Sequence, residues 1–386
     1  NSLQKQRKVL RLVIMSATLD VDIFASHFED CNTVVVKGRT YPVDVLYVPE
    51  RESDWQEAAL LTCLQVHEDE EPGGVLVFLP GQEDIESLME QLCRDLPSVP
   101  GRGPRPDMTG PDGAEVEDFE VVPLYARMPP EEQRKAFKSP KRGVRKFVLA
   151  TNIAETSVTI SGIKYVVDPG LHKTKTLVTA SKTGMELLAT SAISQSQAKQ
   201  RAGRAGRQSA GKCFRLYTEA TYEQLSPQSI PEIERVNLGQ VCLQLMYQGI
   251  MNPMGFPFLT RPNPVALRSA VEELTKLGAL RITCEPWVLL PHGRHMADLP
   301  LTPLFANLLL RADKFGCMKE MLTVVSMLSA DSIFVQPTGD ELRMRRDNAV
   351  RAFFDTSGDF TILVKVYNDW VKNQRDKTWC MQHFLN

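Results

Sequence analysis

Paired cysteines, long apolar runs and metal-ligand clusters are missing from this sequence. None of its eight cysteines belongs to a C-x-x-C pair, which argues against a zinc site or a disulfide scaffold and predicts reduced thiols, as in the cytosol or nucleus. His292 and His295 have no cysteine or carboxylate cluster nearby, so no bound metal is predicted. No apolar run reaches the roughly 20 residues that cross a bilayer, and no signal peptide is visible, so no membrane partner is expected.

An excess of one charge is also absent. With 45 Lys and Arg against 47 Asp and Glu, the net charge of −2 argues against a generic nucleic-acid coat, although it is compatible with a local basic groove. The 386 residues suffice for two or three domains that each bury a core. The chain opens with Asn1 rather than Met, and we expect it to be a fragment of a longer protein.

A nucleotide-binding phosphate loop is missing as well. GRQSAGKC (206–213) fits G-x-x-x-x-G-K, but Cys213 stands where such a loop needs Ser or Thr to hold Mg²⁺, and the stretch follows a predicted helix rather than a strand. The sequence contains no other match, and no acidic DExx quartet after a predicted strand. A chain that binds a nucleotide triphosphate would therefore need other groups to do so.

Short continuous apolar runs alternate with helical patterns up to about residue 230. Such runs predict buried strands of a parallel sheet with helices on both faces, and hence an α/β fold. Residues 97–118 are rich in proline and glycine and predict a disordered insertion or long surface loop. Residues 172–190 predict a β-hairpin, and helices dominate beyond residue 230. The predicted strands are 11–15, 32–36, 44–48, 74–79, 120–126, 145–151 and 163–168.

One stretch concentrates positive charge. AKQRAGRAGRQSAGK (198–212) holds five cations and no carboxylate. If 200–207 is helical, Gln200, Arg204 and Arg207 share one face, because they are spaced at i, i+4 and i+7. Guanidinium groups without a nearby carboxylate suit a polyphosphate, which they can bind bidentately. A solvated basic face or an ion-paired helix is the alternative that spacing alone leaves open.

Six motifs occur in an order that identifies a family resemblance. Together they closely resemble the DEAH-box group of superfamily 2 RNA helicases, and the match begins just before that family's SAT motif, downstream of its Walker A loop and DEAH carboxylates. Later segments such as HGRHMADLPLTP resemble the same family's C-terminal domains. The motifs are MSAT (15–18), GRTYPV (38–43), VFLPGQEDIE (77–86), PLYA (123–126), ATNIAETSVTISGIKYVVDPG (150–170) and QRAGRAGR (200–207).

The resemblance implies two RecA-like lobes that bind ATP between them, followed by winged-helix and helical-bundle (ratchet) domains. We expect residues 1–30 to end the first lobe. Residues 31–228 would form the second RecA-like lobe, including the 97–118 insertion and the 172–190 hairpin. Residues 229–297 would form the winged-helix domain, and residues 298–386 an incomplete ratchet.

For ATP, the resemblance implies that Gln200 positions the attacking water while Arg204 and Arg207 bind the β- and γ-phosphates. Thr159 and Ser161 would lie near the nucleotide. Many family members have Asp where this chain has Ser161, so the resemblance does not fix which sugar or base of the nucleotide this chain would select. Phe137 is a candidate to stack on the adenine, with a core-facing position as the equal alternative.

For RNA, the same resemblance implies contacts to the phosphate and sugar backbone of the RNA. Such contacts predict that RNA binding depends little on the base sequence. Polar groups of the segment 151–161 would meet both ligands at the carboxyl edge of the sheet. Pro80 stands where the family more often has Thr. Ser16 and Thr18 would couple the lobes, the alternative being a strand-end turn. The expected RNA-binding residues are Gly81, Gln82, Thr151, Asn152, Lys173, Lys175 and Lys182, although the lysines would also suit a solvated hairpin.

The implied function is ATP-dependent RNA unwinding or remodelling of RNA–protein complexes, with 3′→5′ translocation on single-stranded RNA. ATP and Mg²⁺ are the implied cofactors, the metal being held mainly by the first lobe. RNA is the implied partner, a G-patch activator is a candidate, and the chain would act as a monomer within larger assemblies. A nuclear or nucleolar location is favoured over the cytoplasm, and mRNA splicing is among the processes expected. The alternative is an inactive, truncated RNA- or partner-binding module; the chain alone is expected to be inactive.

Overall fold

The chain folds into two compact units, one of Asn1–Thr174 with Leu188–Ile230 and one of Lys175–Leu187 with Pro231–Asn386. The structure is a computed structural model. It describes residues 12–15, 21–28, 31–36, 38, 41–50, 54–96, 118–156, 158–177, 186–282, 287–330, 333–335 and 340–385.

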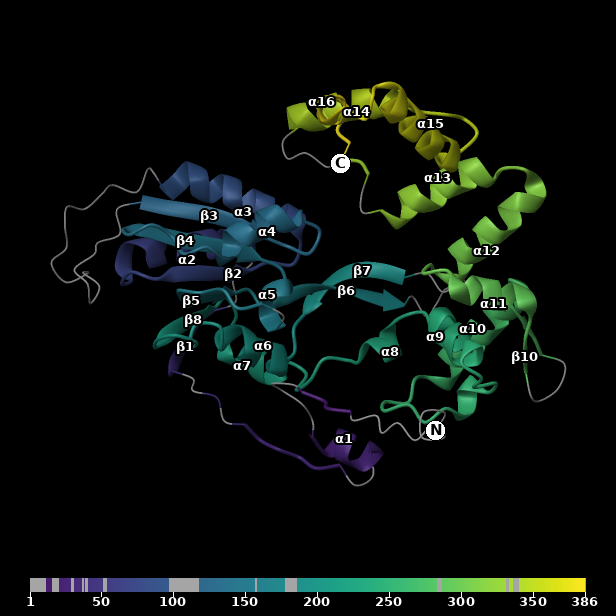
Figure 1. The fold of residues 1–386 in the computed structure, drawn as a ribbon. Helices are drawn as coiled ribbons and strands as arrows, with labels where there is room; N and C mark the ends of the chain where they lie inside the picture. The colour runs from purple at the N-terminus through teal and green to yellow at the C-terminus, as the bar shows by residue number, and fades with distance from the viewer. Residues whose placement is uncertain are drawn as a thin grey trace. The chain divides into compact units, whose positions relative to one another are not determined.

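The first unit is built on a six-stranded sheet in the order β1-β8-β5-β2-β4-β3, in which every neighbouring pair is parallel (Figure 1). The predicted parallel α/β sheet is thus confirmed. Pro123 lies on β3, at one edge of the sheet, where its missing N–H interrupts no inner ladder. The strands are β1 (Val43–Tyr47), β2 (Gly74–Phe78), β3 (Asp118–Leu124), β4 (Val144–Ala150), β5 (Ile163–Asp168) and β8 (Gly211–Arg215).

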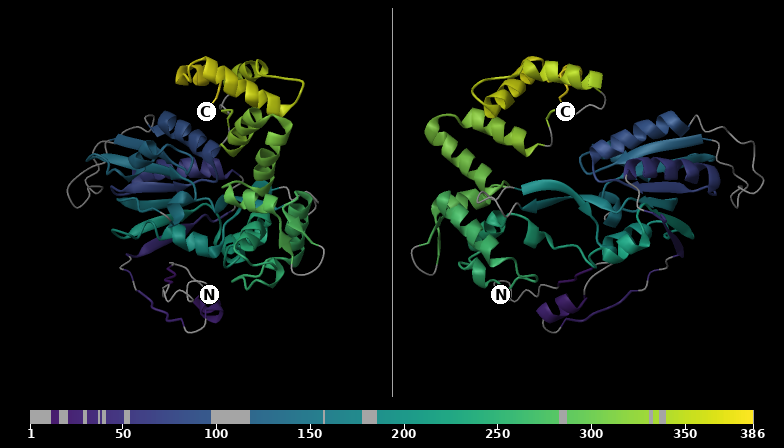
Figure 2. Two further views of the ribbon diagram at one scale, coloured as in Figure 1. Left: turned by 45° about the vertical axis from the view of Figure 1, so that its right-hand side comes forward. Right: turned by 180° about the vertical axis from the view of Figure 1, so that it is seen from behind.

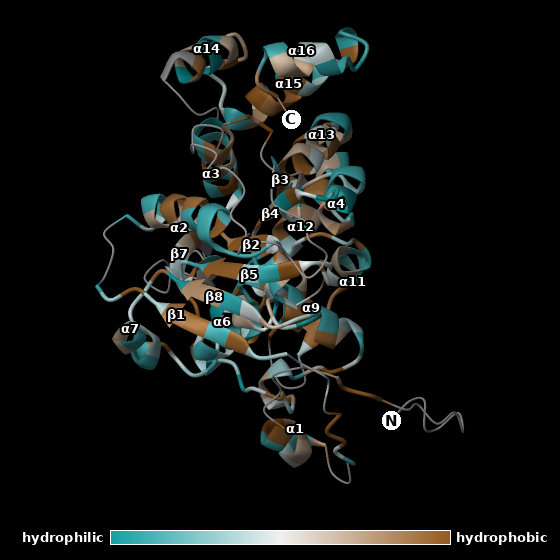
Figure 3. Cartoon of the chain, turned by 90° about the vertical axis from the view of Figure 1, so that its left-hand side faces the viewer, coloured by the Kyte–Doolittle hydropathy of each residue, from teal (hydrophilic) through white to brown (hydrophobic). Residues whose placement is uncertain are grey.

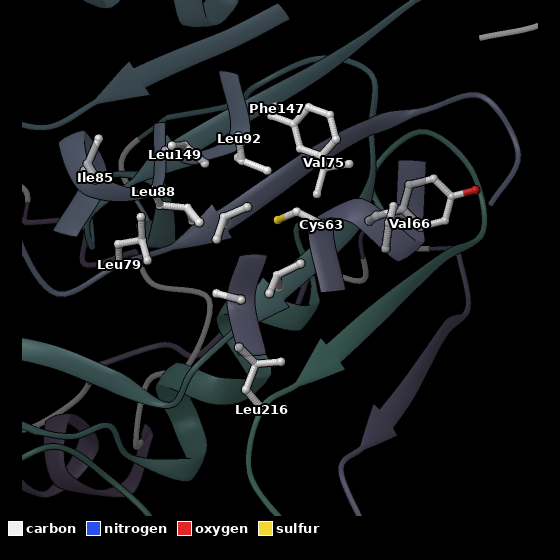
Figure 4. Close-up of a cluster of buried hydrophobic side chains, with 14 of the residues drawn as sticks. Cys63, Val66, Val75, Leu79, Ile85, Leu88, Leu92, Phe147, Leu149 and Leu216 are labelled. Atoms are coloured by element: carbon white, nitrogen blue, oxygen red, sulfur yellow. The ribbon is translucent and has the colours of Figure 1, made fainter. Parts of the chain in front are cut away.

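Alternate residues along the strands bury two separate cores, because successive side chains of a strand point to opposite faces. Val75 and Val77 of β2 belong to the core under α2 and α3, which Figure 4 shows. Leu76 and Phe78 belong to the other core, with residues of α4, α5 and α6. The brown residues on β2 and β5 in Figure 3 reflect this double burial. The helices of this unit are α1 (Val21–His27), α2 (Trp55–Asp69), α3 (Gln82–Asp95), α4 (Pro130–Phe137), α5 (Ile153–Thr156), α6 (Gln195–Ala202) and α7 (Glu219–Gln224).

Two of the predicted strands are wrong where the structure describes them. Residues 12–15 and 32–36 belong to no strand, and their apolar side chains are exposed, up to 85% for Met15 and Val36. An apolar run becomes a strand only when a neighbouring strand takes up its backbone N–H and C=O groups. Within the described residues, no strand pairs with either segment.

The partly buried ring of His67, on α2, leads us to expect that the stability of the first unit depends on pH. Its ring packs against Phe119 and Phe147, and burial, together with Arg145, lowers its pKa to about 4. The unfolded chain, whose histidine titrates near 6.5, therefore binds more protons between these two pH values. We expect the free energy of unfolding to fall by about 1–2 kcal/mol as the pH drops from 6.5 to 4, since the ring keeps part of its hydration. Urea unfolding of the chain and of His67→Gln would test this; an unchanged pH slope in the variant would contradict it.

The second unit is mostly helical where the structure describes it, with one small antiparallel sheet of β9 (Leu280–Arg281) and β10 (Val288–Leu289) after α10. One core joins α9, α10, α11 and α12, so it continues past the expected boundary at residue 297 to Ala306. A smaller core lies around Phe353 and Val366. The helices, drawn from two sides in Figure 2, are α8 (Glu232–Arg235), α9 (Gly239–Tyr247), η3 (Pro253–Gly255), α10 (Pro264–Lys276), α11 (Pro291–Asp298), α12 (Pro303–Ala312), η4 (Asp313–Phe315), α13 (Met318–Ser329), α14 (Asp340–Arg351), α15 (Asp359–Lys372) and α16 (Lys377–Gln382).

Two further strands, β6 (Leu171–Leu177) and β7 (Glu186–Ala192), form a sheet of their own. They overlap the segment 172–190, for which a hairpin was predicted, and extend one residue before it and two residues after it. The predicted hairpin turn, with Lys182, and most of the 97–118 insertion lie outside the described residues.

Candidate functional site

The arginine motif is a helix end followed by a turn, and not a continuous helix. α6 begins with a capping box formed by Ser194 and Gln197 and ends at Ala202. Arg204 and Arg207 therefore lie in the turn 203–207 that leads to β8, and the predicted helical face shared with Gln200 is wrong. Gln200 is half-buried on the last turn of α6.

Gly206 explains why the helix stops. Its carbonyl accepts a 2.9 Å hydrogen bond from the N–H of Tyr41, just before β1. A Cβ on Gly206 would lie 2.6 Å from the carbonyl oxygen of Tyr41 and 2.7 Å from Cγ2 of Val43. Only glycine allows this close approach of two backbones. The turn is thereby held against the edge of the sheet.

The turn directs both arginines to one segment of the chain, the crossover between β4 and β5. Arg204 donates from Nη1 to the carbonyl of Val158 at 2.9 Å and from Nη2 to the carbonyl of Glu155. Arg207, which is exposed, donates to Oγ1 of Thr159. Burial, and next the charge of Arg207, lower the pKa of Arg204 to about 10, so Arg204 is still cationic at neutral pH. The two hydrogen bonds to Val158 and Glu155 use two of the five N–H donors of the Arg204 guanidinium.

Two further residues of the expected nucleotide site lie in this unit. Phe137 is 36% exposed while Ala136 occupies the core position of α4, so the core-facing alternative for Phe137 is wrong. Ser161 is exposed, and the N–H of the following Gly162 donates at 2.7 Å to Oε1 of Gln208. That bond ties the Ser161–Gly162 turn to the residue that follows Arg207. Sequence reasoning did not single out Gln208.

A second group of residues gathers at the carboxyl ends of β2, β4 and β5. Gly81 and Gln82 follow β2, and Asn152 follows β4. The N–H of Leu79 donates to the carbonyl of Ala150 at 2.8 Å, which holds the two strand ends side by side. This carboxyl edge is defined by the described candidates Gly81, Gln82, Thr151, Asn152 and Lys173. The carboxyl ends of parallel strands are where ligand sites typically form in such sheets.

Lys173 of β6 belongs to the carboxyl edge by contact. Its ammonium is the nearest group to Gly81, where any Cβ would meet it, and lies 4.0 Å from the Glu83 carboxylate. Lys173 is half-buried and Asn152 is exposed. The side chain of Lys175, and all of Lys182, Ser16 and Thr18, are outside the described residues, so their expected roles stay predictions.

The expectation that residues 151–161 all lie at the carboxyl edge is wrong for Ser161. This residue lies two positions before β5, and the carbonyl of Gly162 accepts a 2.8 Å hydrogen bond from the N–H of Gly74 at the start of β2. The reason is topological: a connection between parallel strands must run back along the sheet before the next strand begins. The crossover therefore joins the carboxyl edge at Thr151 to the arginine turn at Thr159.

Two cations of the arginine-rich stretch, Arg201 and Lys212, form ion pairs with distant carboxylates, so the ion-paired alternative holds for them. Arg201 is 1% exposed; its Nε donates to Glu155 at 3.2 Å and its Nη1 to Asp168 at 2.8 Å. Burial lowers the pKa of Arg201, but the two carboxylates more than offset this and raise it. Lys212 pairs with Glu70 at 2.7 Å. The carboxylates lie at least 33 residues away in the sequence, so local composition gave no signal for them.

The described residues contain neither a candidate membrane span nor a candidate metal cluster. Across the described ranges, no helix combines the length and hydrophobicity that crossing a bilayer requires. No group of three or more His, Cys, Asp or Glu side chains suited to a metal occurs in that same part of the chain.

The fold and the two sites define a class, the second RecA-like lobe of a helicase followed by a helical associated region. Residues 56–209 match the model of the helicase conserved C-terminal domain, and residues 302–363 match the ratchet-like helicase associated domain HA2. The E. coli DExH-box NTPase HrpB is similar in structure, with a TM-score of 0.69 and 31% identity over 86% of this chain and 39% of that chain.

Curated relatives narrow the class to a family. The ATP-dependent RNA helicase DHX33 of Homo sapiens is 40% identical over 391 residues, which cover 99% of this chain and 53% of the relative. The pre-mRNA-splicing factor ATP-dependent RNA helicase prp22 of Schizosaccharomyces pombe is 39% identical over 98% of this chain and 31% of the relative. The chain belongs to the DEAH-box RNA helicase family. It spans about half the length of DHX33 and less of prp22.

Proposed function

We propose that the chain supplies the second lobe of an ATP-driven RNA helicase or RNA–protein remodelling enzyme. The observation that carries the proposal is the crossover between β4 and β5. One end, at Thr151 and Asn152, lies at the carboxyl edge, and the other, at Val158 and Thr159, accepts hydrogen bonds from Arg204 and Arg207. A short segment with a ligand site at each end can make hydrolysis at one depend on occupation of the other.

On the nucleotide side, the arginine turn suits a triphosphate held by a first lobe. Within the described residues Arg204 and Arg207 form no ion pair with a carboxylate, and their guanidinium groups would neutralise charge on the β- and γ-phosphates. Gln200 would orient the attacking water, Phe137 would stack on the adenine, and Thr159 and Ser161 would lie beside the nucleotide. Mg²⁺, when bound, neutralises phosphate charge, and its ligands would come mainly from the first lobe.

On the RNA side, the carboxyl edge offers backbone N–H groups of Gly81 and Gln82, polar side chains of Thr151 and Asn152, and the ammonium of Lys173. Such groups bind phosphate and sugar oxygens and read no base edges, so RNA binding would depend on salt and little on sequence. Lys175 and Lys182 would extend the basic path along the hairpin, and Ser16 and Thr18 would connect the two lobes.

The finer assignments also belong to this proposal. Closing and opening of the lobes on ATP would move the chain 3′→5′ along single-stranded RNA. A G-patch protein is a candidate activator, with the chain monomeric in its assembly. The name of prp22 favours mRNA splicing and a nuclear or nucleolar location over the cytoplasm.

A complementation experiment, in which a separate first lobe is added to the chain, distinguishes an enzyme from an inactive binding module. RNA-stimulated ATP hydrolysis would be measured for the chain alone and for the chain mixed with the first lobe of a relative such as human DHX33. We expect activity in the mixture and none in the chain alone. A mixture that binds ATP and RNA but does not hydrolyse ATP would favour the RNA- or partner-binding module.

Replacing Lys173 with glutamine is expected to weaken single-stranded RNA binding about fivefold at 0.1 M salt, and to a similar extent for every sequence. The slope of log affinity against log salt should fall by about one, because one phosphate contact is lost. Fluorescence anisotropy across a salt series measures both quantities. Lys164→Gln, which removes the same charge from the Lys164–Glu71 pair on β5, is the control. Equal losses in the two variants would remove Lys173 from the RNA site.

A further inference from the structure

Glu155, on the short helix α5, has hydrogen bonds to three functional parts of the first unit. Its N–H donates at 3.0 Å to the carbonyl of Asn152, at the carboxyl edge. Its own carbonyl accepts from Nη2 of Arg204, in the arginine turn. Its carboxylate accepts from Nε of Arg201 at 3.2 Å, and from Nε2 of Gln197 at 3.5 Å. The side chain is only 7% exposed.

Arg201 anchors this arrangement to the sheet. Its guanidinium binds Oδ1 of Asp168, the last residue of β5, at 2.8 Å, and the carbonyl of Leu171, the first residue of β6, at 3.1 Å. It also lies over the ring of Phe78, 4.7 Å from the centroid. Leu171 is two residues before Lys173 of the carboxyl edge. The anchor thus connects α5 to the end of β5 and to β6, the strand that carries Lys173.

We propose that Glu155 is a positioning residue that transmits RNA binding at the carboxyl edge to Arg204; this inference rests on the proposed function. RNA that pulls on Asn152 or on the start of β6 would move the backbone of Glu155, since both are bonded to it or to its partner Arg201. The carbonyls of Glu155 and Val158, which hold the guanidinium of Arg204, would move with it. The ion pair of the Glu155 carboxylate with Arg201 fixes the position of α5 against α6. A displacement of Asn152 therefore moves α5 as a rigid element, and the carbonyls bonded to Arg204 move with it.

The charge balance predicts that Glu155 can be changed without unfolding the unit. One guanidinium faces two buried carboxylates, so removing Glu155 leaves Arg201 and Asp168 as a matched pair. Burial raises the pKa of Glu155 while Arg201 lowers it less, so the negative charge there is held at a cost. Glu155→Gln can still accept the N–H of Arg201, whereas Glu155→Ala cannot.

The test follows the guanidinium of Arg204 directly, without ATP. Chain labelled with ¹⁵N-arginine is titrated with a single-stranded oligouridylate, and the Nε–H resonance missing from Arg204→Lys assigns Arg204. We expect RNA to shift this resonance in the unmodified chain and in Glu155→Gln, and the shift to be lost in Glu155→Ala although RNA affinity changes less than about twofold. Glu70→Gln, which neutralises a paired glutamate at Lys212, is the matched control and should behave as the unmodified chain.

A second readout uses the two-lobe mixture. RNA stimulation of ATP hydrolysis should fall about tenfold in Glu155→Ala, within the usual range of coupling between sites, and little in Glu155→Gln. RNA that binds without shifting Arg204 in the unmodified chain, or an equal shift in Glu155→Ala, would overturn the inference alone. Failure of RNA to bind, or full activity of Arg204→Ala, would overturn the proposed function and the inference with it.

Discussion

Replacing Arg204 with alanine is expected to lower RNA-stimulated ATP hydrolysis by the two-lobe mixture about 10³-fold. A guanidinium that stabilises charge developing on a transferred phosphoryl group contributes at least this much in related reactions. The same variant should bind single-stranded RNA almost unchanged, because Arg204 contacts the carbonyls of Glu155 and Val158 and not the carboxyl edge. The measurements are steady-state ATP hydrolysis, with kcat and KM separated, and RNA anisotropy.

Two variants make this prediction specific. Arg204→Lys keeps a positive charge but loses the planar fork, and should recover only a small part of the lost activity. Arg94→Ala removes a 70%-exposed arginine from α3, a helix that covers the opposite face of the sheet, and should leave activity within about twofold. An Arg204→Ala mixture that keeps full activity would show that the arginine turn does not act on ATP.

Replacing Arg201 with methionine is expected to destabilise the first unit by about 3–5 kcal/mol. Methionine fills a similar volume, but Glu155 and Asp168 would then be buried without a cation, at 7% and 0% exposure. Each would lose a charged hydrogen bond that no water can replace. The cost is therefore that of two uncompensated charges and not the modest net value of one ion pair.

The unit in question can be followed by its own tryptophan. Of the four tryptophans, only Trp55 lies in the first unit, so replacing Trp287, Trp370 and Trp379 with phenylalanine isolates its urea transition. Lys212→Met is the control. The Lys212 side chain, which pairs with Glu70, is 39% exposed, so the loss of unfolding free energy should stay below about 1 kcal/mol. Equal losses for the two variants would mean that the buried cluster around Arg201 contributes no more than a surface pair.

Much of the fold was predictable because its causes are local. β2 reads GVLVF without interruption, as a strand buried on both faces must, and α2 and α3 show helical spacing of apolar residues. The same reasoning failed for Val34, Val35 and Val36, which have the composition of a strand and lie exposed. Strand composition is a local property, whereas pairing requires a second strand from elsewhere in the chain.

For the candidate site, too, some features follow from the local sequence and others from tertiary contacts. The sequence by itself determined the family, the arginine motif, and the presence of glycines and polar residues after β2 and β4. Only the tertiary structure decided that α6 ends at Ala202, because Gly206 must approach the backbone of Tyr41. It also decided that Arg201 is a buried anchor, while Arg204 is half-buried and donates to the carbonyls of Glu155 and Val158. The partners Glu155 and Asp168 lie 46 and 33 residues before Arg201, so only the folded sheet brings these charges together.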